Sequence, residues 1–332
     1  MTAPLRVPGE QRARGAGILE PMPSRVQSLG HYQPSRVLTN ADLSAIVDTT
    51  DEWIMRRVGI KTRHLAADDE TVADMGARAG AKALAAAGLD AGDIDLVVLA
   101  TTTAKERSPS NAARVSAQLG IPAPAAIDVN TFCSGFTHAL ALADHAIGAG
   151  SATRALVVAS EKFSDVTDWT DRSTCVLLGD GAGAAVVTAS ETAGISPVVW
   201  GSDPSMGRAV RLEPPSNLFA QDGQTVFRWV TTALPDIARR VCERAGVTPA
   251  ELAGVVLHQA NLRIIDPLIE RLGAVNAVIA RDVVDSGNTS AASIPLAFSK
   301  LVERGEIATG GPVLLLGFGG GLSYAGQVVA CP

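Results

Sequence analysis

The sequence contains few cysteines, and none of them forms a binding motif. Only 4 of the 332 residues are cysteine, and they lie far apart without a CxxC pair. The sequence therefore predicts neither a disulfide framework nor a zinc site. The 5 histidines show no HxxH or HExxH spacing, so they supply no metal motif either. The four cysteines are Cys133, Cys175, Cys242 and Cys331.

Long hydrophobic runs and a surplus of positive charge are also missing. Apolar runs such as 96–100 and 313–316 are far too short to span a bilayer. The chain has 28 basic and 34 acidic side chains, which argues against general binding to nucleic acid. Residues 1–23 lack the continuous apolar stretch of a signal peptide, so we expect a flexible N-terminal extension and a cytoplasmic location.

The sequence does contain an internal repeat. Residues 87–100, AGLDAGDIDLVVLA, align without a gap with residues 245–258, AGVTPAELAGVVLH. In each copy a glycine at an expected helix end, Gly88 or Gly246, precedes a polar turn and a short buried strand. The preceding helices should begin at Thr71, which forms a capping box with Asp74, and cover 226–245.

A second pair of apolar strands, 155–159 and 313–316, also matches between the halves. Alternating helices and strands in two related halves predict two mixed sheets that pack through a shared helical layer. The halves should divide within 186–215. The proline-containing segment 191–215 is interpreted as a connecting loop.

Cys133 has the most reactive setting of the four cysteines. A strand-like run at 126–129 precedes it, and apolar residues at helical spacing follow it from Phe136 to Ile147. Unpaired N–H groups and the dipole at a helix N-terminus favour a thiolate, which is the nucleophilic form. The spacing alone leaves a packed cysteine as an equal alternative. Cys175 lies in an apolar run and is expected in the core.

Two polar residues also end predicted strands or begin predicted helices. His258 ends the strand of the second repeat, where a side chain points out of the sheet into a crevice. Asn288 precedes the expected helix 291–301 and is either a turn residue or a donor to a developing oxyanion.

Two glycine-rich stretches do not fit nucleotide-binding motifs. Residues 179–183 follow a strand-like run but lead into another strand-like run, whereas the dinucleotide fingerprint requires a helix next. Residues 317–321 lack the Lys-Ser/Thr of a phosphate loop. They allow close approach of the main chain, so a backbone N–H there could face a ligand.

Taken together, the motifs resemble the ketoacyl-acyl carrier protein synthase III family of the thiolase superfamily, from about Ser24 to the C-terminus. The resemblance implies a five-layered αβαβα fold made of two duplicated halves, 24–190 with the nucleophile and 191–332 with the histidine and asparagine. It also implies a homodimer. The motifs are DEWIMRRVGIKTRH at 51–64, DVNTFCSGF at 128–136, GDGAGAAV at 179–186, LHQANLRI at 257–264, SGNTSAAS at 286–293 and GFGGGLSYAG at 317–326.

The resemblance also implies roles for individual residues. Cys133 would accept the acyl group, while His258 and Asn288 would hold the malonyl thioester carbonyl and stabilise the enolate. The N–H groups of Cys133 and Gly320 would form the oxyanion hole. Residues that would line the site are Phe136 and Phe318.

Coenzyme A thioesters would be substrates, and no cofactor would be bound permanently. Trp53 and Arg57 would sandwich the adenine with Arg172 nearby, and Asn261 would contact the pantetheine arm. An acidic acyl carrier protein would dock on a basic patch. The matching positions of that patch are Arg263, Arg228 and Arg271.

Several positions depart from the family pattern, among them two that would concern the acyl group. Phe132 precedes the nucleophile where a small residue is usual, and Ser108 stands where an aromatic residue often reaches the partner's acyl pocket. Both changes concern acyl specificity rather than chemistry. They suggest a specialised enzyme for a starter unit, with a drifted housekeeping enzyme as the alternative.

The resulting hypothesis is a condensing enzyme that loads an acyl-CoA starter onto Cys133 and joins it to malonyl-acyl carrier protein. This step would begin fatty acid or polyketide synthesis. Acyl transfer to a hydroxyl or amine acceptor without condensation is the alternative. A non-catalytic partner subunit is a third reading, which the intact set of Cys133, His258 and Asn288 disfavours.

Overall fold

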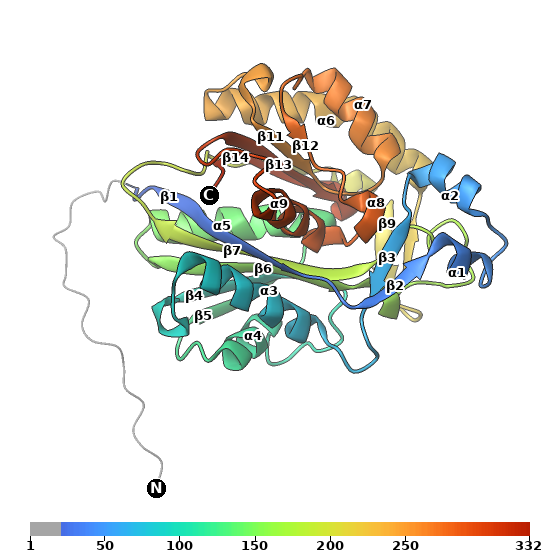
Figure 1. Ribbon diagram of the computed structural model, residues 1–332, viewed down its shortest axis with the longest axis horizontal. Coiled ribbons are helices and arrows are strands. Elements are labelled where there is room, and N and C mark those ends of the chain that lie inside the picture. The colour runs from blue at the N-terminus through green and yellow to red at the C-terminus, as the bar shows by residue number, and fades with distance from the viewer. Residues whose placement is uncertain (1–20) are drawn as a thin grey trace, which may run out of the picture.

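Two five-stranded mixed sheets form the framework of the chain (Figure 1). The computed structural model describes residues 21–332, so the predicted extension 1–23 lies almost wholly outside the described residues. In the first sheet, β4 pairs in parallel with both β5 and β6, while β7 pairs antiparallel with β6 and β1. In spatial order the strands are β5 (Ala125–Val129), β4 (Leu96–Ala100), β6 (Arg154–Lys162), β7 (Asp180–Ala189) and β1 (Ser24–Tyr32).

The second sheet repeats this pattern of two parallel and two antiparallel pairings. The strands of the aligned repeats, β4 and β11, occupy the same second place in their sheets, which confirms the predicted duplication. In spatial order the strands are β12 (Val278–Ile279), β11 (Gly254–Leu257), β13 (Pro312–Gly319), β14 (Ser323–Ala330) and β8 (Val199–Ser202).

Helices complete the five layers (Figure 1). Two helices lie between the sheets and bury the cluster of apolar residues that both halves share. Two others cover the outer face of the first sheet, and two cover that of the second. The central pair is α5 (Gly135–Gly148) and α9 (Ser293–Glu303), the first outer pair is α3 (Val72–Ala87) and α4 (Asn111–Leu119), and the second is α6 (Gly223–Ala245) and α7 (Leu262–Leu272).

The predicted helix ends are confirmed. Thr71 and Asp74 form a capping box at the start of α3. Gly88 and Gly246 end α3 and α6 with left-handed φ values of 65° and 71°. A residue with a Cβ is strained in this conformation, which explains why glycine stands at both ends.

Shorter elements extend from the sheets. Between β1 and α3 the chain forms a two-stranded sheet and two helices, and α8 follows β12. Their bounds are β2 (Arg36–Thr39), α1 (Asn40–Ser44), α2 (Asp51–Val58), β3 (Thr62–Leu65) and α8 (Val283–Ser286). Among residues 21–332 no helix combines the length and the apolar character needed to cross a membrane.

Two expectations from the sequence were wrong. The segment 191–215, interpreted as a connecting loop, contains β8 and β9 (Val210–Glu213), and β9 pairs with β10 (Leu218–Gln221). Both strands are only four residues long, too short for a periodic pattern to stand out. The run before Gly179 forms turns rather than a strand, because the Asp171 carboxylate accepts hydrogen bonds from residues that follow it.

The glycines of 179–183 are explained by helix packing. A Cβ at Gly183 would lie 2.6 Å from the backbone nitrogen of Leu296, and one at Gly181 would lie 3.0 Å from the Leu296 side chain. Both glycines lie within β7, against which α9 packs. The motif therefore allows α9 to approach the first sheet closely, and this contact sets the position of the segment that precedes α9.

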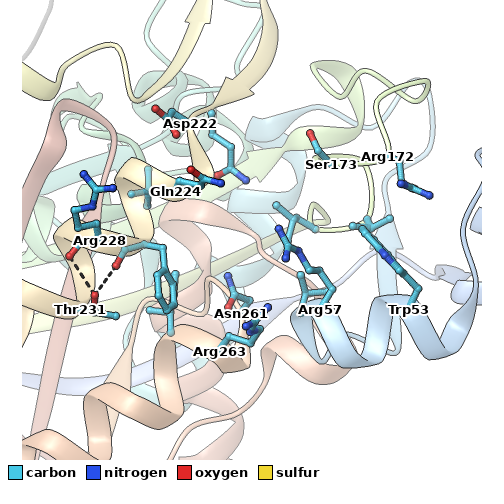
Figure 2. A pocket seen from close by; sticks show the side chains of 18 residues that line it. Trp53, Arg57, Arg172, Ser173, Asp222, Gln224, Arg228, Thr231, Asn261 and Arg263 are labelled. Carbon is cyan, nitrogen blue, oxygen red and sulfur yellow. Dashed lines mark hydrogen bonds between the residues drawn. The ribbon is translucent and has the colours of Figure 1, made fainter.

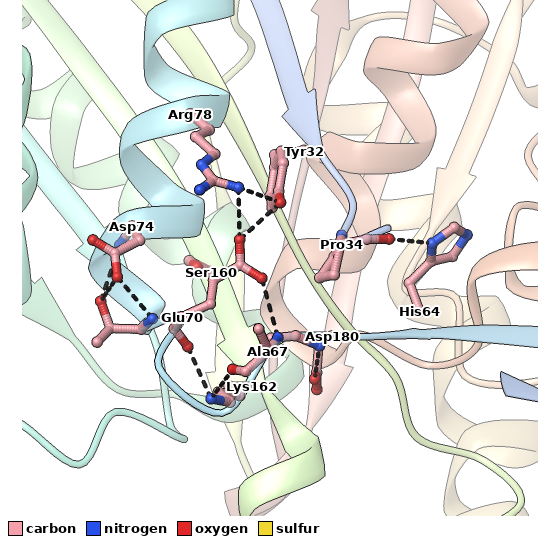
Figure 3. Close-up of polar contacts among 12 residues, drawn as sticks. Tyr32, Pro34, His64, Ala67, Glu70, Asp74, Arg78, Ser160, Lys162 and Asp180 are labelled. Atoms are coloured by element: carbon pink, nitrogen blue, oxygen red, sulfur yellow. Dashed lines mark hydrogen bonds and ion pairs between the residues drawn. The ribbon is translucent and has the colours of Figure 1, made fainter. Parts of the chain in front are cut away.

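A buried polar network fixes the segment between β3 and α3 (Figure 3). Lys162 is 4% exposed, and its Nζ donates to the backbone oxygens of Ala67, Asp68 and Glu70 at 2.7–3.1 Å. The Asp180 carboxylate accepts from the Ala66 N–H at 2.8 Å, while burial raises its pKa to about 6. These groups satisfy one another and serve the fold.

Candidate active site

Cys133 lies at the predicted strand-to-helix junction. A 3₁₀ turn, Phe132–Ser134, connects the end of β5 to α5, and Cys133 is 7% exposed within it. Phe132 has a φ of 51°, in the left-handed region that a bulky side chain rarely adopts. Such strain persists only where the surrounding structure holds it, and it often occurs at functional sites.

The end of β13 presses against this turn. A Cβ at Gly319 would lie 3.0 Å from the Cys133 sulfur, and a Cβ at Gly320 would lie 2.6 Å from the Phe132 ring. No side chain fits at either position, which explains the glycine-rich stretch 317–321. The main chain of β13 therefore passes directly beside the thiol.

Two hydroxyl groups join the nucleophile turn to the glycine segment. Ser134 Oγ lies 2.8 Å from Ser323 Oγ, and Ser323 Oγ donates to the Gly320 carbonyl oxygen at 2.7 Å. Both serines are buried, so these bonds are shielded from water. They restrain the carbonyl group of Gly320, the residue whose N–H the sequence assigned to an oxyanion hole. That assignment stays a prediction.

The protonation state of Cys133 differs from the one expected at a helix N-terminus. Burial raises the pKa of the thiol to about 12, although the hydrogen bond from Ser290 Oγ, at 3.4 Å, opposes this. Desolvation outweighs the effect of the helix end because a buried thiolate loses its hydration. Cys133 is therefore a thiol at neutral pH in the free protein, and attack requires that its proton leaves.

His258 follows β11 and is 2% exposed. Its Nδ1 lies 2.8 Å from Ser293 Oγ, and its ring stands edge-on to Phe318 with the centroids 5.3 Å apart. Burial lowers the pKa of His258 to about 3, so the ring is neutral at physiological pH. It can act there as a hydrogen-bonding group without a net charge.

Asn288 is held by its backbone and by its side-chain oxygen. Its N–H donates to Leu177 O at 2.8 Å, and its carbonyl oxygen accepts from the Gly179 N–H at 3.1 Å. Its Oδ1 accepts from the Ser290 N–H at 2.9 Å. The amide Nδ2 is then the part of the side chain that is available to donate to a substrate oxygen.

Ser290 connects the three residues predicted to be catalytic. Its Oγ contacts Cys133, its N–H donates to Asn288 Oδ1, and its backbone, near His258, raises the pKa of that ring. Ser290 adopts a φ of 48°, which turns the chain sharply between these contacts. No role for Ser290 was predicted from the sequence, although it lies in the motif at 286–293.

A cavity of about 860 Å³ (Figure 2) is lined by none of Cys133, His258 and Asn288, and it is linked to them through Leu177. Leu177, which binds the Asn288 backbone, forms part of its wall. The Arg172 guanidinium carbon lies 4.9 Å from the centre of the Trp53 ring. The cavity is lined by six of the residues that the resemblance assigned to substrate or carrier binding, namely Trp53, Arg57, Arg172, Asn261, Arg228 and Arg263.

Comparison with known proteins identifies the family. Models of 3-oxoacyl-[acyl-carrier-protein] synthase III and of its C-terminal part match residues 127–204 and 242–331. A β-ketoacyl-[acyl-carrier-protein] synthase III from Streptomyces avermitilis is 69% identical over 312 residues, which cover 93% of this chain and 99% of that protein. A Streptomyces coelicolor relative of the same name is 67% identical, with the same coverage. The chain belongs to the 3-oxoacyl-[acyl-carrier-protein] synthase III family.

Solved structures of the family have the same fold as this chain. The priming β-ketosynthase of the R1128 polyketide pathway aligns with a TM-score of 0.93 and 42% identity over 96% of this chain and 99% of that one. The synthase III of Aquifex aeolicus aligns with a TM-score of 0.88 and 39% identity, over 92% of this chain and 99% of that one. The predicted thiolase-type fold is therefore confirmed. The chain is an enzyme of this family, with its condensing function in the initiation of fatty acid or polyketide synthesis.

Other assigned residues of this synthase do not line the cavity. Phe136 is 1% exposed within the apolar cluster between the sheets. Ser108 is exposed on the loop after β4, where its carbonyl oxygen accepts from Arg114. Arg271 lies on α7 and donates to the Thr231 carbonyl oxygen beside the cavity. Their roles in acyl binding and carrier docking stay predictions.

The buried thiol should react as a thiol with a high pKa. We expect the alkylation rate of Cys133 by iodoacetamide to rise about tenfold per pH unit from pH 7 to 10, because only the thiolate reacts. Mass spectrometry of the Cys133 peptide measures the rate. Ser290→Ala, which removes the hydrogen bond that lowers the pKa, should react more slowly at pH 8. A plateau near pH 7 would show that the thiolate is already formed.

Proposed function

We propose that this synthase transfers an acyl group from coenzyme A to Cys133 and then condenses it with malonyl-acyl carrier protein. The observation that carries the proposal is the arrangement around Ser290. It brings a buried thiol, a neutral histidine and an asparagine amide together without a strong base. Decarboxylation needs donors directed at a developing enolate oxygen, and uncharged N–H groups provide them.

In the first half-reaction the Cys133 sulfur attacks the acyl-CoA carbonyl. The carbon–sulfur bond to coenzyme A then breaks, and the thiol proton leaves with coenzyme A as its thiol. The N–H groups of Cys133 and Gly320 would stabilise the tetrahedral oxyanion. Ser323 restrains the Gly320 carbonyl in the next peptide unit, and so limits rotation of the main chain beside this N–H.

In the second half-reaction His258 and Asn288 Nδ2 would donate to the thioester carbonyl oxygen of the malonyl group. Loss of carbon dioxide leaves an enolate, whose carbon attacks the acyl-Cys133 carbonyl and expels the cysteine sulfur as a thiolate. The thiolate then takes up a proton from water, which restores the thiol. Burial favours both steps, since donors act more strongly where water is excluded. The Phe318 ring beside His258 is an apolar neighbour that would disfavour the malonyl carboxylate and favour its loss.

The rim of the cavity, called its mouth below, would bind coenzyme A and the acyl carrier protein in turn. Trp53 and Arg57 would sandwich the adenine, with Arg172, which stacks on the Trp53 ring, beside them, and Asn261 would contact the pantetheine arm. The same rim would attract acidic carrier protein, since it combines several cations. Those cations are Arg228, Arg263 and Arg271.

Mutation should separate these two functions of the mouth. Trp53→Ala should raise KM for acyl-CoA about tenfold by removing a stacking surface, and leave loading from acyl-N-acetylcysteamine unchanged. Arg271→Glu should raise KM for malonyl-carrier protein and weaken its salt dependence. Lys82→Glu on α3, which covers the opposite sheet, is the matched charge control (Figure 1). Equal effects of both variants on both substrates would contradict the assignment.

Mass spectrometry with a panel of acyl-CoAs, followed by malonyl-carrier protein, tests the reaction itself. We expect a mass gain on Cys133 and then release of carbon dioxide and product. Cys133→Ala should not be acylated. His258→Ala and Asn288→Ala should be acylated but should condense about 100-fold more slowly, because each lacks one enolate donor. The exposed Asn276→Ala is the control.

Each other outcome has a distinct meaning. Acylation of Cys133 without release of carbon dioxide would sink the condensation proposal and favour simple transfer to another acceptor. No acylation with any donor would favour a non-catalytic subunit. The acyl group that loads fastest identifies the starter unit. It also tests whether Phe132, whose ring packs on Gly320, limits the acyl site.

We further propose a homodimer formed through β5. This strand is an edge of the first sheet, and Ile127 at its centre is 49% exposed. The neighbouring helix α5 carries Leu142, 40% exposed, and contacts the ring of Trp200, 43% exposed. An exposed apolar edge strand favours pairing with another strand, and a second copy about a two-fold axis satisfies both edges at once.

A charge at the centre of β5 should disrupt this dimer. Ile127→Asp places two carboxylates near the two-fold axis, so we expect a shift from dimer to monomer in sedimentation velocity at micromolar concentration. Val275→Asp is the control, because Val275 is 81% exposed on the turn after α7. A wild-type monomer, or a dimer that Ile127→Asp leaves intact, would disprove pairing through β5.

A further inference from the structure

Ser293 forms a buried contact with the histidine of the site. Its Oγ lies 2.8 Å from His258 Nδ1, and the same oxygen accepts from the Gln259 N–H at 3.2 Å. Ser293 and His258 are each 2% exposed. The sequence reasoning assigned no role to Ser293, which is the first residue of α9.

The number of protons determines the direction of the contact. A serine hydroxyl has one proton and two lone pairs, and a neutral imidazole has one N–H. The Gln259 N–H takes one lone pair of Ser293, and the buried hydroxyl proton still requires an acceptor of its own. Nδ1 of His258 is the acceptor within reach, and in residues 21–332 no other acceptor is bonded to this hydroxyl. The imidazole proton then belongs on Nε2.

The partners of Ser293 are themselves held in place. Gln259 Nε2 donates to Leu257 O at 2.8 Å, and its Oε1 accepts from the Val283 N–H at 3.2 Å. Ser293 is fixed by the close packing of α9 on β7 at Gly183. Neither side of the contact can therefore move away without breaking other buried interactions.

We propose that Ser293 is a positioning residue that holds His258 in the Nε2–H tautomer, so that the ring donates to the substrate carbonyl. This proposal rests on the proposed condensation. In the other tautomer Nε2 would present a lone pair to the enolate oxygen and repel it. Ser293 thus acts through His258 and makes no contact with the substrate.

The tautomer can be observed directly, without any assay of activity. In protein labelled with ¹⁵N-histidine, long-range ¹H–¹⁵N correlation spectra distinguish a protonated ring nitrogen from a bare one, and the His258→Ala spectrum assigns the signals. We expect Nε2–H with bare Nδ1 in the wild type from pH 5 to 8. Ser293→Ala should give a mixture of tautomers, and Ser293→Thr, which keeps the hydroxyl, should give the wild-type pattern. Nδ1–H in the wild type, or an unchanged Ser293→Ala spectrum, overturns the proposal.

Kinetics provide the second readout. Ser293→Ala should load acyl groups onto Cys133 at the wild-type rate, whereas carbon dioxide release from malonyl-carrier protein should slow about tenfold or more, as for loss of an oxyanion donor. Ser299→Ala is the matched control, because Ser299 lies on the same helix and its Oγ contacts His31 Nδ1 at 2.9 Å. A wild-type enzyme that fails to condense refutes the proposed function alone. Normal condensation by Ser293→Ala refutes the role of Ser293 alone.

Discussion

The structure depends on the close passage of the end of β13 over the turn that holds Cys133. Glycines at 317, 319 and 320 remove the side chains that would separate the two segments. The contact buries the thiol, brings the Gly320 main chain beside it and places Phe318 against His258. Protein interiors are packed densely, so a single added methyl group at Gly319 would displace the nucleophile itself.

Burial then decides the chemistry, because it removes charge from the site. Burial raises the pKa of Cys133 and lowers that of His258, so both groups are neutral. A cysteine and a histidine at the surface could instead form a thiolate–imidazolium ion pair. A neutral site is suited to a reaction in which charge develops on the substrate, since fixed dipoles need no reorganisation as it forms. Hydroxyl groups such as those of Ser290 and Ser293 set the directions of these dipoles.

The sequence predicted the features that depend on neighbouring residues. The capping box at Thr71, the glycine helix ends and the place of Cys133 between β5 and α5 all follow from local patterns. The state of the thiol did not follow, because desolvation comes from segments far along the chain. The contacts of Ser290 with Cys133 and of Ser293 with His258 likewise join distant segments. Contacts between distant segments leave no periodic pattern in a single sequence, so they could not be predicted from it.

Duplication explains why the site needs both halves. The first half supplies Cys133 after β5, and the second supplies His258 after β11, the strand equivalent to β4. The segment with Asn288, Ser290 and Ser293 belongs to the second half, yet α9 packs on β7 of the first. Its backbone is also bonded to the turn at 177–179 of the first half. The geometry of the donors around the thiol is therefore set by the contact between the halves, and neither half alone could maintain it.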